Sequence, residues 1–445
     1  MSHRSGARAR LVRRTRPLAA VCLSAAIIGA ASSPAFAAGA ASSGTAASSG
    51  TAAGVVGLYG SQDPTYDGVY RQSLSIVALV AASKTPDPRA VDWLLAQQCA
   101  DGAFTAYRTD PSLACAASKE DENATAAAIQ ALAAVGKPTA TAVAALKRFQ
   151  LPDGGFYDNA AFGAPASDAN STGLAQSAFA AVGIDPASVS TGGKTADDYL
   201  RSLQLPCSAT KGAGAFDFQA ETTLAANDYA TVQATLGQLG KQFTIAPSAV
   251  SAGVPSCSPA TDAATSAGDA IGYLAARLTA TNGAIPSGFG TGTDWTSTAN
   301  AVLDLAAAGQ GSSAIAAGLA ALTANVNAYV HSGGADLPGP LATLLLTAHA
   351  TGTNATSFGG IDLAAALAAT ERTAAPSPSP TPSTTPTATP TGTGGTTPTL
   401  PMTGTHSVVS LTVLGSALVL AGGIAIGFSR RRVNSPISST GGEHS

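Results

Sequence analysis

Carboxylate side chains are the groups in this sequence best suited to chemistry. Asp121, Glu122, Asp168 and Asp294 stand at or beside the starts of separate alanine-rich segments. If these starts meet in space, two of the carboxylates could act as an acid–base pair, as in glycoside hydrolysis. Helix capping explains the same positions, because an Asp before a helix accepts hydrogen bonds from its first N–H groups, worth on the order of 1 kcal/mol each. We therefore assign no catalytic residue.

Other reactive constellations lack essential members. A Ser-His-Asp triad would have to use His331 or His349, and His349 lies in LLLTAHATG near the expected end of a helix, where an imidazole suits the terminal carbonyl groups. A magnesium-binding Asp-Asp-x-x-Asp motif fails at Asp197-Asp198, because Arg201 follows. The sequence has no Cys-x-x-Cys spacing for zinc. We predict neither a metal nor a cofactor.

The carboxylates belong to an internal repeat. Three segments align without gaps and place Asp four residues before Thr and fifteen before Gly: Asp121 to Gly136, Asp168 to Gly183, and Asp294 to Gly309. Asp as N-cap, Ala and Leu inside and Gly at the end predict a helix in each. Because apolar residues occur nearly all round, these helices should be buried. Weaker copies near Asp67, Asn227 and Asp336 bring the number of units to six.

A second element follows most of these helices. Segments 98–104 and 150–156 both have the pattern Gln-x-x-Asp-Gly-x-Phe after a predicted helix. Gln204 repeats the helix end, with Gly214-Ala215-Phe216 after an insertion, and Asn282-Gly283 keeps the turn alone. Asp-Gly and Asn-Gly favour tight turns that require positive φ. Each unit is therefore predicted to hold an inner helix, a turn and an outer helix.

This pattern resembles the prenyltransferase/squalene-oxidase repeat, although phenylalanine replaces the usual tryptophan. The resemblance implies an all-α fold, an (α/α)6 toroid of six helix pairs over residues 54–372. Terpene cyclases of this kind carry Asp-x-Asp-Asp, and the nearest run, Thr195 to Asp198, lacks the first Asp. Protein prenyltransferases hold zinc through Asp, Cys and His, which this chain cannot readily supply. The α-domain of extracellular cobalamin-binding proteins is a non-catalytic toroid, but its partner β-domain is missing here.

Polar groups at the starts of the inner helices form a candidate ligand mouth. In a closed ring these starts would surround one concave opening, where a small-molecule ligand could bind. The predicted mouth residues are Asp121, Asn123, Asp168, Asn170, Asn227, Asp294 and Trp295.

Both ends of the sequence are targeting segments. Residues 1–37 carry six arginines, an apolar run and Ala35-Phe36-Ala37, which is typical of a signal peptide. We expect 38–53 to be disordered. At the other end come Leu400, Pro401, Met402, Thr403 and Gly404, then an apolar stretch at 408–428 and a basic tail at 429–445. Twenty-one apolar or small residues suffice for a transmembrane helix, and the arginines hold its end in the cytoplasm.

The C-terminal unit resembles the LPXTG cell-wall sorting signal of Gram-positive surface proteins. The resemblance implies that sortase cleaves between Thr403 and Gly404 and joins Thr403 to peptidoglycan. The membrane helix would then anchor the chain only transiently, and the mature protein would be attached covalently to the wall. Residues 373–399 are rich in Pro and Thr and predict an extended stalk.

Charge and cysteine content fit an exported protein. The region between signal peptide and tail has 14 basic and 25 acidic residues, a difference of −11, which argues against nucleic acid as a partner. Four cysteines remain there, and an even number predicts disulfides with three possible connectivities. Sequence proximity favours the pairs Cys99–Cys115 and Cys207–Cys257.

The sequence thus favours a wall-anchored protein that displays a non-catalytic toroid for a small molecule or a partner. Two alternatives stay open. One is an extracellular enzyme acting on a polyprenyl or glycan substrate through the mouth carboxylates. The other is a structural spacer or adhesin, which a toroid filled by its own side chains would favour.

Overall fold

The computed structural model describes residues 56–161, 163–220, 222–288 and 290–373. These residues form thirteen α-helices and two short hairpins, which confirms the all-α prediction. The predicted signal peptide, stalk, sorting motif and transmembrane helix lie outside them. Within the described ranges, no helix is long and apolar enough to cross a membrane.

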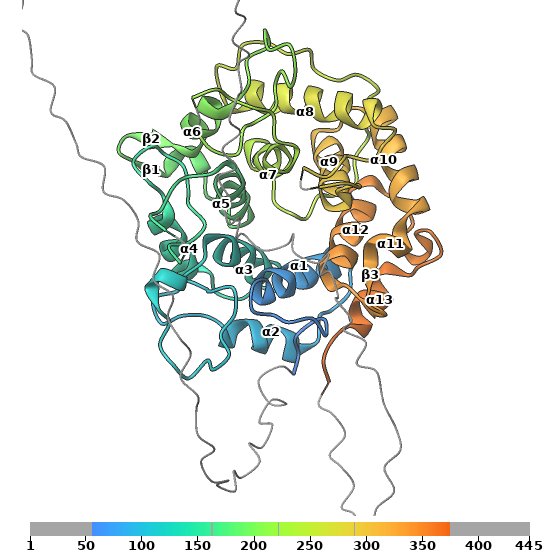
Figure 1. The fold of residues 1–445 in the computed structure, drawn as a ribbon. Coiled ribbons are helices and arrows are strands. Elements are labelled where there is room, and N and C mark those ends of the chain that lie inside the picture. The colour runs from blue at the N-terminus through green and yellow to red at the C-terminus, as the bar shows by residue number, and fades with distance from the viewer. Residues whose placement is uncertain (1–55, 162, 221, 289, 374–445) are drawn as a thin grey trace, which may run out of the picture. The chain divides into compact units, whose positions relative to one another are not determined.

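In the described part of the chain, six helices pack into an inner ring, whose arrangement Figure 1 shows. They are α1 (Gly68–Ala81), α3 (Glu122–Ala134), α5 (Ala169–Ala181), α7 (Asp228–Gln238), α9 (Trp295–Ala308) and α12 (Pro338–Thr351). Each packs against the next in this order, and α12 packs against α1, so the ring is closed.

A second layer surrounds the first, and each outer helix packs on the inner helix that precedes it in the chain. The outer helices are α2 (Pro88–Ala96), α4 (Ala140–Leu146), α6 (Ala196–Leu203), α8 (Ala263–Ala280), α10 (Ser312–Ala324) and α13 (Leu363–Ala369). The remaining elements are α11 (Val326–Val330), the hairpin of β1 (Ser190–Thr191) with β2 (Lys194–Thr195), and the hairpin of β3 (His331–Ser332) with β4 (Ala335–Asp336). Short 3₁₀ turns occupy Ala117–Lys119, Lys147–Phe149, Pro186–Ser188 and Ala355–Ser357.

Small residues let the inner helices approach closely. On α5, eleven of thirteen residues are buried. A Cβ added to Gly173 would lie 2.4 Å from the carbonyl oxygen of Gln233, and one added to Gly237 would lie 2.3 Å from that of Gly173. Side chains larger than glycine would therefore push α5 and α7 apart.

The predicted helix caps are present. The Asp121, Asp168 and Asp294 carboxylates each accept a hydrogen bond from the N–H group three residues on, at 2.8, 2.8 and 2.9 Å. The residues predicted to stop these helices, Gly136, Gly183 and Gly309, all have positive φ. Asp-x-x-x-Thr with a terminal Gly therefore specifies α3, α5 and α9 from cap to stop.

The threonine of the same motif joins neighbouring units. Its hydroxyl accepts a hydrogen bond from the N–H of the hydrophobic residue that ends the preceding turn, and we call this contact the threonine clasp. It joins Phe104 to Thr125 and Phe156 to Thr172 at 2.9 Å, and Phe216 to Thr231 and Ile285 to Thr298 at 3.0 Å. The turn after one outer helix is thereby fixed to the next inner helix.

The turn also touches the next outer helix. Gly154 has φ +90°, and a Cβ there would lie 2.2 Å from the carbonyl oxygen of Thr195, the residue that caps α6. Only glycine fits, because both the backbone conformation and the close approach exclude a side chain. This contact explains the glycine of Asp-Gly beyond the turn itself.

The segment before the first helix and the segment after the last helix together form one further junction of this kind. Gly57-Leu58-Tyr59 stands before the first helix, and Glu371-Arg372 follows the last. The Gly57 N–H donates to the Arg372 carbonyl, and the Arg372 N–H donates to the Leu58 carbonyl, both at 2.9 Å. The side-chain oxygen of Gln72 accepts the Tyr59 N–H at 2.8 Å, in place of a threonine. The chain therefore closes its ring by pairing its first turn with its last helix.

Two disulfides cross-link loops outside the ring of inner helices. Cys99 is bonded to Cys115 and Cys207 to Cys257, with Cα–Cα distances of 5.7 and 5.5 Å. Both pairs are those that sequence proximity predicts.

The threonine clasp can be tested at Thr172. Thr172→Val keeps the shape of the side chain but leaves the buried Phe156 N–H without its acceptor, which costs about 1–3 kcal/mol of unfolding free energy. Urea denaturation of the mature chain measures this loss. Thr172→Ser should recover most of it, and the exposed Thr141→Val should change little. Equal effects of Thr172→Val and Thr141→Val would contradict the role of the clasp.

Candidate functional site: the central cavity

A cavity lies inside the ring, and side chains from all six inner helices line it. Its volume is about 60 Å³. Since one water needs about 10–15 Å³ by this measure, the cavity has room for about four waters or one small ligand.

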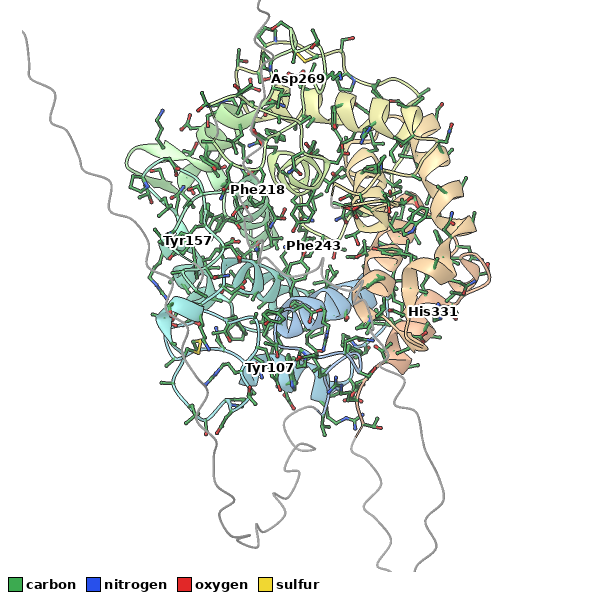
Figure 2. The ribbon with its side chains drawn as sticks, viewed as in Figure 1. Tyr107, Tyr157, Phe218, Phe243, Asp269 and His331 are labelled. Atoms are coloured by element: carbon green, nitrogen blue, oxygen red, sulfur yellow. A yellow bond between two sulfur atoms is a disulfide. The ribbon has the colours of Figure 1, made fainter. Side chains whose placement is uncertain are left out.

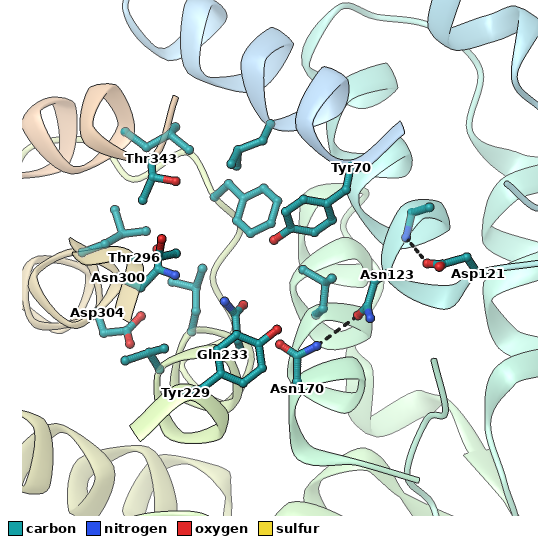
Figure 3. Close-up of a pocket in the computed structure, with 18 of the residues that line it drawn as sticks. Tyr70, Asp121, Asn123, Asn170, Tyr229, Gln233, Thr296, Asn300, Asp304 and Thr343 are labelled. Atoms are coloured by element: carbon teal, nitrogen blue, oxygen red, sulfur yellow. Dashed lines mark hydrogen bonds between the residues drawn. The ribbon is translucent and has the colours of Figure 1, made fainter. Parts of the chain in front are cut away.

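One part of the lining is polar (Figure 3). The Asn170 side-chain amide donates to the Asn123 side-chain oxygen at 3.3 Å, and the Asn123 amide donates to an oxygen of Asp158 at 3.0 Å. Tyr70 on α1 and Tyr229 on α7 line the cavity beside these amides. Neutral donors and acceptors therefore converge at this part of the wall.

Another part of the lining is apolar. Leu74, Leu236, Leu303 and Leu346 contribute to it, together with Phe243 from the segment after α7. Figure 2 shows Phe243 near the middle of the ring. Its backbone N–H donates to the side-chain oxygen of Gln130 on α3 at 2.9 Å. This long-range hydrogen bond holds the segment after α7 across the inner helices.

Asp304 is the one carboxyl that α9 contributes to the cavity wall. The residue is 1 % exposed, and its Oδ2 atom has no hydrogen-bond partner among the described residues. Figure 3 shows its side chain among the groups that face the cavity. Burial raises the pKa of Asp304 well above the ordinary value of an aspartate. Burial therefore disfavours the ionised form of this carboxyl, which keeps one unused oxygen.

Four further carboxyls gather beside the polar part. Glu122 is fully buried, and neither of its carboxyl oxygens has a hydrogen-bond partner among the residues that the structure places. Burial, and then the charges of Asp168, Asp158 and Asp121, raise the pKa of Glu122 well above its usual range. Burial likewise raises the pKa of Asp168 to about 6, and raises the pKa values of Asp121 and Asp158. These acids hold protons that exposed carboxyls would have lost.

The structure separates the predicted mouth residues into two groups. Asp121, Asn123 and Asn170 line the cavity. The other four lie outside its lining: Asp168, Asn227, Asp294 and Trp295. The first three of these accept capping hydrogen bonds from backbone N–H groups, and Trp295 packs against the hydrophobic core.

Three important lining residues were not predicted: Tyr70, Tyr229 and Asp304. Each lies within an inner helix, where residues are buried on all sides and periodicity does not identify the face toward the cavity. A signal for Asp304 was present, because it is the only charged residue of its helix, WTSTANAVLDLAAA.

The remaining chemical candidates have structural partners. The Asp197 carboxylate accepts hydrogen bonds from the side chains of Gln176 and Gln238, and Asp198 forms a capping box with Thr195. Two groups have metal-like spacing, Cys207, Cys257 and Asp269, and Cys99, Asp101 and Glu120. Their sulfur atoms are bonded in disulfides and are not thiolate ligands.

A comparison with known protein families matches the C-terminal part of the chain. Residues 393–435 match the family described as the LPXTG cell wall anchor motif. The chain is a surface protein attached covalently to the cell wall. The match spans the five sorting residues and the following apolar run, and it implies attachment by sortase.

Solved structures resemble the ring itself. A protein from Actinoplanes is 16% identical, with a TM-score of 0.44, and the alignment covers 66% of this chain and 93% of that one. A variant of the type II terpene cyclase MstE from Scytonema, in complex with geranylgeranyl dihydroxybenzoate, is 13% identical, with a TM-score of 0.40 and coverage of 64% and 88%. A second MstE variant with the same substrate is 14% identical, with a TM-score of 0.37 and coverage of 68% and 88%. No curated protein matches significantly.

The buried acids predict that stability falls as pH rises. A carboxyl whose pKa is raised on folding contributes its full stability below its unfolded value, about 4.5 for Glu122, and loses it as pH rises through the folded value. Glu122→Gln removes this ionisation. We expect the unfolding free energy to fall less steeply between pH 5 and 8, by up to about 1.4 kcal/mol per pH unit.

Urea denaturation at several pH values measures this slope. Asp262→Asn is the control, because Asp262 is an exposed cap whose pKa is lowered by its hydrogen bonds to Thr265. Its ionisation therefore affects stability below this pH range. A Glu122→Gln slope identical to that of the unsubstituted chain would show that Glu122 is ionised throughout.

The sorting motif predicts where the wall bond forms. Thr403→Ala should leave the chain in the membrane fraction, because the resemblance to the sorting signal implies that Thr403 supplies the acyl group transferred to peptidoglycan. Digestion of walls with a muralytic enzyme, followed by immunoblotting, measures the wall-bound share. Thr399→Ala, just before the motif, should behave as the unsubstituted chain does. Wall attachment of the Thr403→Ala chain would place the bond at another residue.

Proposed function

We propose that this chain displays on the cell wall a non-catalytic helical ring whose central cavity binds a small molecule. The observation that carries the proposal is Asp304, a buried carboxyl that faces the cavity with an oxygen left without a partner. A buried polar atom without a hydrogen bond costs about 1–3 kcal/mol. A ligand that contacts Asp304 would recover part of this cost.

The composition of the lining also favours a ligand over a purely structural ring. A spacer needs only a packed apolar centre, in which polar side chains would lower stability. Asn123 and Asn170 instead bring amides to the wall from neighbouring helices, and Gln233 and Asn300 add two more. The sorting signal and the predicted stalk would keep this cavity outside the membrane and within reach of solutes.

An enzyme is the second candidate, and one observation favours it. An uncharged acid beside an apolar wall, as in Asp304 beside the leucines, is also what acid catalysis on a neutral apolar substrate requires. Conversion of a prenyl or glycan compound by the purified chain, lost in Asp304→Asn, would support this function over simple binding.

Mass spectrometry of the mature chain tests the proposed binding. Chain released from walls by a muralytic enzyme should be heavier under native than under denaturing conditions, by the mass of a non-covalent ligand. Asn300→Phe should abolish the difference, because its side chain faces the cavity and a ring there would fill it. Asn325→Phe, on the exposed surface between α10 and α11, is the control.

Equal native and denatured masses in the unsubstituted chain, together with no rise in melting temperature on adding wall and cell extracts, would contradict the proposal. An unchanged ligand mass in folded Asn300→Phe would place the ligand elsewhere in the molecule.

A further inference from the structure

We infer that the cavity takes a small organic cation, an amine or quaternary ammonium group, held between Asp304 and the aromatic side chains of Tyr70, Tyr229 and Phe243. The inference rests on the proposed binding function and names the chemical class of the ligand. It follows from the charges of the lining, from its aromatic rings and from the free oxygen of Asp304.

The lining carries carboxyl groups without basic partners. Among the residues described, no Lys, Arg or His side chain lines the cavity, whereas Asp121 and Asp304 both do. Glu122, Asp158 and Asp168 stand behind the polar part of the wall. In this surrounding of low dielectric the ionised forms of these acids would repel an anion such as a phosphate, and a cation would favour their ionisation.

The arginines of α1 and α8 already have acidic partners. Arg71, next to Tyr70, pairs with Asp67 at 2.9 Å. Arg277 on α8 pairs with Asp228 at 2.9 Å. Neither arginine lines the cavity. Neither of them therefore pairs with the unused oxygen of Asp304.

Aromatic rings provide the second element of cation recognition. Tyr70, Tyr229 and Phe243 line the same cavity, from α1, α7 and the segment after α7. A cation within about 6 Å of such a ring is attracted by its quadrupole, most strongly when water is excluded. Figure 3 shows Asp304 and Tyr70 on opposite sides of the group of lining side chains.

Binding of a cation would change the protonation of Asp304. In the empty cavity burial favours the protonated form of the carboxyl, because no basic group among the described residues lines the cavity to compensate it. When an ammonium group enters, the carboxylate becomes its counter-ion and the proton of Asp304 passes to solvent. Proton release on binding therefore distinguishes a cation from a neutral ligand, which would accept the hydrogen bond of the intact acid.

The other titratable groups around α9 have partners of their own. On α7 and α8, Asp228 accepts hydrogen bonds from Tyr273 and Arg277. Asp269 on α8 accepts from the backbone N–H of Ser258. Tyr229 on α7 and His349 on α12 remain neutral around pH 7, because burial raises the pKa of the first and lowers that of the second. The sequence of α10 has no titratable side chain. Around α9, Asp304 is therefore the group whose ionisation binding should change, and Asp304→Asn separates its proton from any that Asp121 releases at the same cavity.

Calorimetric titration of the mature chain tests the inference with choline and its uncharged analogue 3,3-dimethylbutan-1-ol. The charge of choline does not change with pH, so any pH dependence belongs to the protein. We expect choline to bind at least tenfold more tightly than the alcohol. Its affinity should rise up to tenfold per unit between pH 5 and 7, with close to one proton released per ligand in buffers of different ionisation enthalpy.

Asp304→Asn replaces one uncharged group by another of the same size, so the ring should melt as the unsubstituted chain does at pH 5. Choline affinity should fall at least tenfold and proton release should fall by the share of Asp304, while affinity for the alcohol should fall much less. Asp262→Asn, an exposed cap on α8, should change none of these quantities.

Equal affinity for choline and the alcohol, or no binding of choline at all, would overturn the inference, as would a choline affinity that Asp304→Asn leaves unchanged. A non-covalent ligand seen by native mass spectrometry would still support the binding function in these cases. Failure of both experiments would contradict the binding function itself.

Discussion

The hydrogen bond from a turn N–H group to a threonine hydroxyl is the contact on which the rest of the ring depends. It ties the end of one outer helix to the start of the next inner helix, as between Phe156 and Thr172. The same threonine hydroxyl donates to the carbonyl of the capping Asp168 at 2.6 Å, so one side chain fixes both the turn and the helix start. Four successive junctions carry this contact. At the closing junction, where the end of the chain meets the first turn, Gln72 supplies the acceptor instead.

Closure of the ring creates both the cavity and its electrostatic cost. Inner helices built from Ala, Ser, Thr and Gly pack close together, so the cavity between them is small. The capping acids are brought near one another by the same repeat, and Glu122 is buried among them without a basic partner. Such an arrangement lowers stability at neutral pH. Buried polar groups without partners are commonly found at functional sites. Here such groups lie at the cavity wall or directly behind it.

Much of the fold could be predicted from the sequence, because the residues that determine each helix lie close together in the chain. The spacing of Asp121, Thr125 and Gly136 contains a cap, a clasp and a stop within one segment. Ring closure was harder to predict, because its motif is split between Tyr59 and Glu371 at opposite ends of the ring. No local pattern joins two residues so far apart in the chain.

The site was less predictable than the fold, for a related reason. Residues at helix starts, such as Asn123 and Asn170, are marked by their position after a cap. Tyr229 and Asp304 lie within helices that are buried on every side, where no alternation shows which face meets the cavity. Phe243 comes from an irregular segment, and only its tertiary hydrogen bond to Gln130 places it in the ring.

A crystal structure of the mature chain released from native walls tests the central claim most directly. The account predicts electron density for a small molecule in the cavity, in contact with the Asp304 carboxyl and bounded by Tyr70 and Tyr229. A cavity closed by those same side chains, with Asp304 hydrogen-bonded to a protein group and no density between them, would contradict it.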